Sequence, residues 1–112
     1  MRIAVPIVKG TLASHFGHCE AFALIDADVE KKKIVGRKDV VPPPHEPGAL
    51  PPWLAGHGAE LVIAGGMGSR AQGLFQSQGI QVLTGAPAAA PEKIVEDYLA
   101  GALKTGANIC DH

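Results

Sequence analysis

Two short apolar runs, residues 60–64 (ELVIA) and 80–84 (IQVLT), constrain the fold more than any other feature of the sequence. Each run lies between two segments in which apolar residues recur at helical spacing. Strands that alternate with helices pair in parallel, because the helix carries the chain back across the sheet before the next strand begins. Such crossovers are right-handed in nearly all proteins. The second half of the chain therefore predicts parallel strands covered by helices.

Three helices are expected around these strands. Glycines mark the predicted ends of the first two, at Gly58 and Gly79, because glycine readily adopts the left-handed conformation that closes a helix. Prolines are compatible with the first turn of the first helix and open the third, since the first N–H groups of a helix have no helical partner. The expected helices span residues 50–57, a segment that ends near residue 78, and residues 91–104.

The first third of the chain has a different pattern. Residues 2–8, 21–27 and 33–41 are rich in apolar and β-branched side chains, and the turn between the last two predicts a hairpin. Residues 42–44 are all proline and stop the third strand, because proline cannot donate to a strand ladder. The three strands form an antiparallel meander. We therefore expect an α/β fold with a five-stranded mixed sheet in the order 3-2-1-4-5, strands counted along the chain, and helices on both faces.

Composition excludes several classes of function. The 112 residues predict one domain, which we assign to residues 1–104, followed by a mobile tail over residues 105–112. A net charge of −1 gives no basic footprint for nucleic acid. No apolar segment reaches the length of a membrane span, and the N-terminus lacks a signal-peptide pattern. We therefore expect a cytoplasmic protein whose two cysteines, Cys19 and Cys110, are reduced.

The predicted topology brings unusual loops to one edge of the sheet. His15, His18 and Cys19 precede the second strand, His45 follows the third, and the glycine segment GGMGSR follows the fourth. In open α/β sheets, ligands bind outside the carboxyl ends of the strands. Soft side chains and a glycine loop should therefore meet in one cleft.

Imidazole and thiolate groups suit zinc, copper or iron–sulfur units. A closed zinc site needs four ligands, and His15, His18 and Cys19 supply at most three, so that a fourth would have to come from His45 or from the tail. Phe16 and Gly17, which lie between the two histidines, are expected to shape the loop, because the ring can anchor it on the core and glycine permits a positive φ.

The glycine segment has two interpretations. It is either a tight turn from strand to helix or a cradle for an anion, because free N–H groups at the start of a helix attract negative charge. Arg70 would add a full positive charge. Met67 is either a core residue or a thioether that contacts a soft metal.

Four segments together resemble a known family: MRIAVPI at the start, SHFGHCEAF from Ser14, GAELVIAGGMGSRAQGLFQSQGIQV in the middle and VEDYLAGAL in the last helix. They resemble the dinitrogenase iron–molybdenum cofactor biosynthesis family. That family includes cofactor carriers of nitrogen fixation and the orange protein, which holds a molybdenum–copper sulfide cluster. The resemblance implies a ribonuclease-H-like motif and non-covalent handling of a metal–sulfide cluster rather than catalysis.

The candidate site combines three segments: the loop of residues 14–19, the loop that follows the three prolines and contains His45, and the glycine segment GGMGSR. Its expected ligand is an anionic molybdenum-containing sulfide cluster of the Mo–Cu–S or Fe–Mo–S type. No organic cofactor is expected, and the partners would be proteins that give or receive the cluster. The candidate cluster-binding residues are Ser14, His15, Phe16, Gly17, His18, Cys19, His45, Gly65, Gly66, Met67, Gly68 and Arg70, with Cys19, His15 and His18 as soft-metal contacts.

Two alternatives stay open on the residues alone. One is a regulatory module that binds zinc or a nucleotide. The other is a small thiol or metal hydrolase, which is less favoured because Mg²⁺-dependent nucleases need several carboxylates. Asp26, Asp28 and Glu60 are expected at the opposite edge of the sheet, and Glu20 is the one carboxylate near the cysteine.

Overall fold

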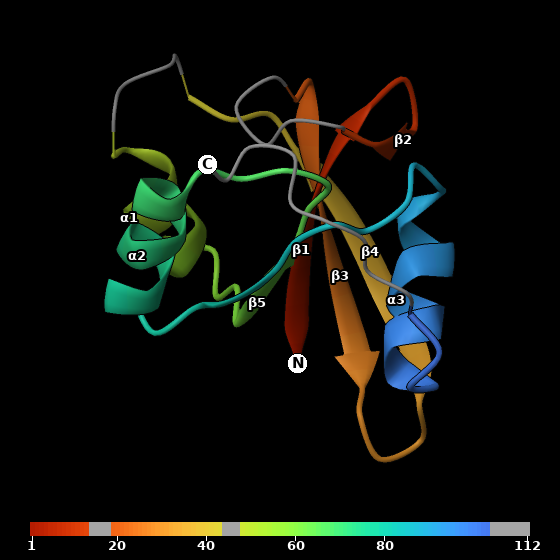
Figure 1. Ribbon diagram of the computed structural model, residues 1–112. Coiled ribbons are helices and arrows are strands. Elements are labelled where there is room, and N and C mark those ends of the chain that lie inside the picture. Colours follow the sequence, from red (N-terminus) through yellow and green to blue (C-terminus); the bar gives the residue numbers. More distant parts are fainter. Residues whose placement is uncertain (14–18, 44–47, 104–112) are drawn as a thin grey trace.

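The computed structural model describes residues 1–13, 19–43 and 48–103 (Figure 1). Three helices and a single mixed sheet make up this part of the chain. None of the described helices is long and apolar enough to cross a membrane. In chain order the elements are β1 (Arg2–Val8), β2 (Thr11–Leu12), β3 (Ala21–Asp28), β4 (Lys33–Val40), α1 (Leu50–Gly56), β5 (Leu61–Ile63), α2 (Ser69–Ser77), β6 (Gln81–Leu83) and α3 (Pro91–Leu99).

The sheet has the predicted order and directions. Its strands lie in the order β4-β3-β1-β5-β6, with β1, β5 and β6 parallel and with β3 antiparallel to both β1 and β4. This confirms the meander followed by crossovers. The sheet has six strands rather than five, because β2 pairs with the end of β1.

The additional strand arises from a tight hairpin. Lys9 and Gly10 both have positive φ, 52° and 82°, which is the backbone of a two-residue type I′ turn. The dipeptide ends β1, as the sequence predicts, but a residue followed by glycine between apolar residues also indicates a hairpin, which was not predicted. The turn folds Thr11 and Leu12 back onto Val8 and Ile7.

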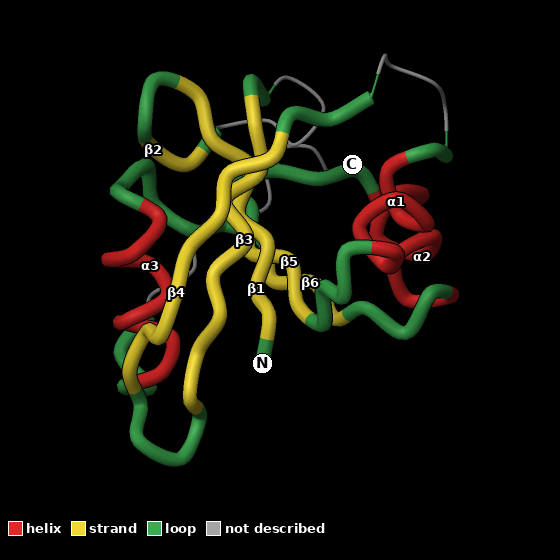
Figure 2. Tube along the Cα trace, turned by 180° about the vertical axis from the view of Figure 1, so that it is seen from behind, coloured by secondary structure: helices red, strands yellow, loops and turns green. Residues whose placement is uncertain are grey.

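Helices cover both faces of the sheet. Figures 1 and 2 show α1 and α2 together on one face and α3 on the other. Alternate side chains of β1 divide between the two layers: Ile3 and Val5 pack with α3, whereas Ala4 packs on the side of α1 and α2. On the α1/α2 side a buried cluster, which we call the α2-side core, contains Phe22, Leu24, Leu54, Val62, Met67 and Phe75.

The last helix ends earlier than predicted. It stops at Leu99 instead of continuing to residue 104. Gly101, with φ of 72°, donates its N–H to the Tyr98 carbonyl at 3.1 Å, and the next N–H, of Ala102, reaches Asp97 at 2.8 Å. These two bonds form a Schellman motif, which satisfies the last carbonyls and stops the helix. The same arrangement ends α1 and α2 at the predicted glycines.

An ion-pair cluster ties α3 to the edge of the sheet. Arg37 on β4 contacts Asp39 at 2.8 Å and Glu92, in the first turn of α3, at 2.6 Å. The guanidinium holds the pKa of Glu92 below its usual value. All three side chains are partly exposed, so the pairs orient α3 more than they stabilise it.

Candidate functional site

The carboxyl ends of β1, β5 and β6 meet at one edge of the sheet, where backbone hydrogen bonds connect the loops that leave them. The Leu12 N–H donates to Ala89 at 2.9 Å and joins the loop after β1 to the loop after β6. The Gly85 N–H donates to Gly65 at 2.6 Å and joins the loops after β6 and β5. The predicted convergence of these loops is therefore present in the described part of the chain.

The glycine loop between β5 and α2 turns its carbonyl groups into the fold. Ala64 accepts from the Ala86 N–H at 3.2 Å and Gly65 accepts from Gly85. Met67 accepts from the side-chain amide of Gln72 at 2.9 Å, and Gly68 accepts from the Gln72 N–H at 3.1 Å. Four of the carbonyls from residue 64 to 68 are thus occupied, so the negative ends of these peptide dipoles do not face a ligand at this edge.

Helix α2 begins directly after this loop. Gly68 is its N-cap residue, with extended φ and ψ of −64° and 152°, and neither a capping side chain nor an acidic residue lies in the first turn. The start of a helix carries the positive end of the helix dipole. The loop and the helix start together present an environment that favours an anion over a cation.

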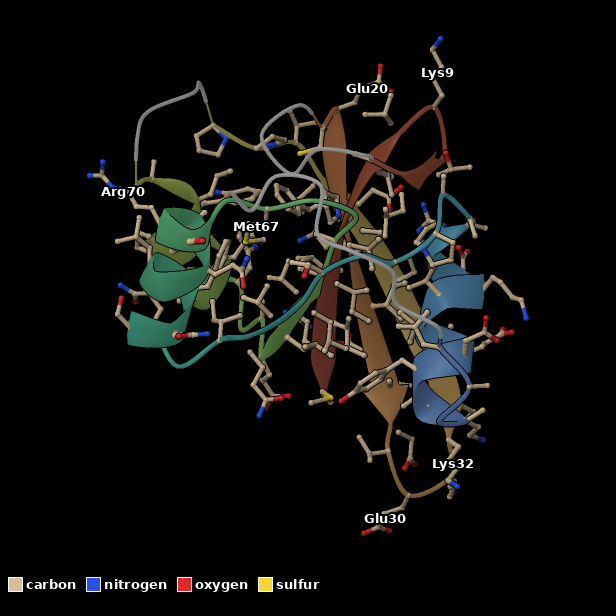
Figure 3. All side chains as sticks on the ribbon, in the orientation of Figure 1. Lys9, Glu20, Glu30, Lys32, Met67 and Arg70 are labelled. Atoms are coloured by element: carbon tan, nitrogen blue, oxygen red, sulfur yellow. The ribbon has the colours of Figure 1, made fainter. Side chains whose placement is uncertain are left out.

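Met67 belongs to the core rather than to the loop surface. Met67 is 1% exposed and lies in the α2-side core with Phe75 and Leu54. Figure 3 shows its side chain inside the molecule, between the sheet and the α1/α2 layer. The side chain of Met67 is therefore a core residue, the first of the two interpretations given above, rather than a thioether that contacts a soft metal. The residue can contribute to a ligand site through its backbone.

Arg70 lies on the outside of the helix layer. Figure 3 shows its side chain directed away from Met67 and from the sheet. It is exposed and pairs with no carboxylate of the described residues. It is also the sole charged residue in the sequence from residue 61 to 91. Among the described residues its guanidinium is therefore an unpaired cation on an otherwise neutral stretch, and its side chain points away from Met67.

Cys19 is a half-buried free thiol just before β3. It packs against the α2-side core, to which Met67 also belongs. The next residue holds this segment on β1: the Glu20 N–H donates to Ile7 at 2.9 Å, and the Glu20 carboxylate accepts the Lys9 N–H at 2.7 Å. Because that carboxylate closes the hairpin, it is committed to the loop rather than to orienting a catalytic pair.

Burial raises the pKa of the Cys19 thiol. The group is therefore neutral at pH 7. Metals bind thiolates, so coordination by Cys19 would require loss of its proton.

The remaining candidates lie outside the described residues. They are Ser14, His15, Phe16, Gly17, His18 and His45, and the same holds for Cys110 and His112 of the tail. Among the residues that the structure does describe, no three His, Cys, Asp or Glu side chains gather closely enough to hold a metal ion. The described part of the candidate site thus consists of Cys19, the glycine loop and the start of α2.

A cavity of about 500 Å³ lies elsewhere, along the edge strand β6. Its walls include Leu61, Gln81 and Tyr98, and none of its described lining residues is a candidate site residue.

One residue that contacts the glycine loop, Gln72, was not recognised in the sequence. The available signal was an amide side chain within one helical turn of a glycine run, where it can reach a loop carbonyl.

The model of one protein family, described as dinitrogenase iron-molybdenum cofactor, matches residues 1–101. The chain belongs to this family. Membership associates the chain with binding of metal clusters, as the resemblance implied. A comparison with curated protein sequences found no match.

Two solved structures show the same fold. The crystal structure of PH0822 is 30% identical in sequence, with a TM-score of 0.85 and coverage of 94% of both chains. The apo form of the orange protein from Desulfovibrio gigas is 24% identical, with a TM-score of 0.72, and the match covers 96% of this chain and 93% of that one. The second comparison supports the fold alone at this identity. The α/β architecture with this strand order is compatible with a ribonuclease-H-like motif.

Proposed function

We propose that this protein binds an anionic metal–sulfide cluster non-covalently at the carboxyl-end edge of its sheet, and that it stores or delivers the cluster without catalysing a reaction. The observation that carries the proposal is the family match over residues 1–101. The inward carbonyls of the glycine loop and the adjacent start of α2 support it, because they leave an edge that suits negative charge.

The contacts would come from three sources. Peptide N–H groups near the start of α2 would donate to cluster sulfides. Cys19, together with His15, His18 and His45, would supply soft contacts. Arg70 would act over a longer range, because its exposed side chain pairs with no described carboxylate and can attract an anion through solvent.

The cluster that we propose contains molybdenum and is of the Mo–Cu–S or Fe–Mo–S type, with no organic cofactor. Carriage in the cytoplasm would involve a protein that assembles the cluster and a protein that receives it. A fully ligated structural metal typically contributes about 10–16 kcal/mol and couples to folding. The buried cores on both faces of the sheet contain enough apolar side chains that the apo protein should fold alone.

Reconstitution tests the proposal. The purified chain is mixed with tetrathiomolybdate and Cu(I), passed through a gel-filtration column, and examined by visible absorbance and metal analysis. We expect coloured protein that retains molybdenum. Wild-type protein that elutes without metal would refute the carrier function, and retention of zinc without colour would favour the zinc-binding alternative.

Charge-removal variants test how the cluster is held. Arg70→Ala should weaken uptake by about two- to fivefold at low salt and reduce the dependence on salt, since an exposed charge is screened. Lys31→Ala is the matched control. Lys31 is also exposed, but it lies in the turn between Glu30 and Lys32, at the opposite end of the molecule from the candidate edge (Figure 3). Equal salt dependence in both variants would remove Arg70 from the proposal.

A further inference from the structure

Gln72 makes two hydrogen bonds to consecutive carbonyls of the glycine loop. Its side-chain Nε2 donates to the Met67 carbonyl at 2.9 Å, and its backbone N–H donates to the Gly68 carbonyl at 3.1 Å. The second bond is an ordinary first turn of α2. The first is not part of the helix, and it requires a side chain of this length with an amide donor at its end.

The side-chain bond determines how one peptide group is oriented. The Met67–Gly68 peptide is trans, since the described residues contain no cis bond. In a planar trans peptide the C=O and the following N–H point in opposite directions. Because the Met67 carbonyl points to Gln72, the Gly68 N–H points away from that side chain. The buried Met67 side chain holds the same peptide from the other end.

Space for a ligand exists beside Gly68. Among the residues that the structure describes, no heavy atom lies within 4 Å of the position that a Cβ at residue 68 would occupy, apart from its chain neighbours. A sulfide or another anion can therefore approach this part of the backbone closely. If the peptide rotated, the Met67 carbonyl would be presented in place of an N–H group and would repel the same anion.

We propose that Gln72 is a positioning residue for the cluster site: its amide locks the Met67–Gly68 peptide in the orientation that presents an N–H group, rather than a carbonyl, to an anionic ligand. The inference rests on the proposed function for the identity of the ligand. The conformational part, which concerns the peptide alone, can be measured without any ligand.

Two substitutions test the role. Gln72→Met keeps the length of the side chain and removes the donor, and Gln72→Glu keeps the shape but places a carboxylate against the Met67 carbonyl. Gln76→Met is the matched control, because Gln76 lies one turn further along α2 and its side chain is exposed. The apo proteins are compared by the amide chemical shift and hydrogen exchange of Gly68 and by their thermal midpoints. The reconstituted proteins are compared by their affinity for the cluster formed from tetrathiomolybdate and Cu(I).

We expect Gln72→Met to shift and broaden the Gly68 amide signal and to weaken cluster binding by about five- to tenfold, the factor that corresponds to one lost hydrogen bond. Gln72→Glu should weaken binding further. Gln76→Met should leave the Gly68 amide signal unchanged and the affinity for the cluster within twofold of that of the wild type. An unchanged Gly68 amide in Gln72→Met would overturn the positioning role whether or not a cluster binds. Failure of the wild type to retain metal, with the Gly68 amide still sensitive to Gln72→Met, would overturn the proposed function alone.

Discussion

Met67 offers the sharpest test of how the glycine loop takes part in binding. A thioether next to a glycine cradle suggests a soft-metal ligand, but the structure buries the residue to 1% exposure in the α2-side core. We predict that the side chain serves packing and that only its backbone belongs to the site. Met67→Leu and Met67→Ala separate these two roles, because leucine conserves volume without sulfur and alanine removes both.

The expected magnitudes follow from burial. Replacing a fully buried methionine by alanine removes its transfer free energy and leaves a cavity, which together cost about 2–5 kcal/mol. Met67→Leu should cost less than about 1.5 kcal/mol, since volume-conserving changes are tolerated. For a domain of this size, a loss of 3 kcal/mol lowers the thermal midpoint by roughly 10–20 °C. Such a loss is a large part of a total stability of about 5–15 kcal/mol.

Urea unfolding followed by tryptophan fluorescence measures these differences directly. Trp53 is the sole tryptophan, and its ring lies 5.8 Å from that of Phe22 in the α2-side core. Cluster uptake by the folded variants is measured in parallel. Met67→Leu should take up the cluster as the wild type does. Loss of uptake in Met67→Leu with stability retained would refute the packing role, and so would an alanine variant as stable as the wild type.

The other predictions concern titration and the backbone. In a Cys110→Ser background, the rate of alkylation of Cys19 should rise with pH, with an inflection above the ordinary pKa of 9.0, because burial disfavours the thiolate. In urea, which unfolds the protein, the inflection should fall to the ordinary value. Gly73→Ala, in the open interior of α2, should raise the free energy of unfolding by about 0.5–1 kcal/mol, whereas Gly79→Ala should lower it by about 1 kcal/mol because its φ is 76°. Glu92 has a lowered pKa, so its pair with Arg37 stabilises the fold above pH 4.5 and is lost as the pH falls through the folded pKa. Arg37→Ala should remove that part of the acid dependence, worth less than about 1 kcal/mol for such exposed groups, and an unchanged acid limb in urea titrations would contradict the assignment.

The sheet was predictable because its signals are local and mutually consistent. Apolar runs between helical segments required parallel strands, and three prolines fixed the end of the meander. The two errors concern single turns. Lys9-Gly10 ends β1 as predicted but also closes a hairpin that adds β2, and Gly101 stops α3 five residues early. Both depend on a glycine whose conformation is decided by its neighbours, which a hydrophobic pattern does not record.

The convergence of the loops at the candidate edge was predictable, but the directions of their side chains were not. Strand direction alone brings the loops after β1, β5 and β6 together, and the structure confirms this convergence. Side-chain direction is different, because it depends on packing across the sheet. No pattern in the sequence indicates that Met67 turns into the core while Arg70 turns outward (Figure 3). The roles of Cys19 and of the histidines stay predictions.

Every helix of the described chain follows a strand whose carboxyl end lies at the candidate edge, so all three point the positive ends of their dipoles toward it. Each helix start is equivalent to about half a positive charge. The first turns of α1 and α2 contain no acidic residue, and the acid in the first turn of α3, Glu92, is paired with Arg37. The three helix starts therefore contribute a positive potential at this edge, although the chain carries a net charge of −1.

The electric field of the helix starts does not change with pH. It arises from peptide groups, which neither gain nor lose protons between mildly acidic and mildly basic conditions, so its strength is the same at pH 5 and at pH 9. Lysine or histidine clusters that attract anions behave differently, because they discharge as the pH rises. The pH dependence of anion binding at this edge would then report the protonation of the ligand and of Cys19, and the attraction by the helix starts would be a constant background.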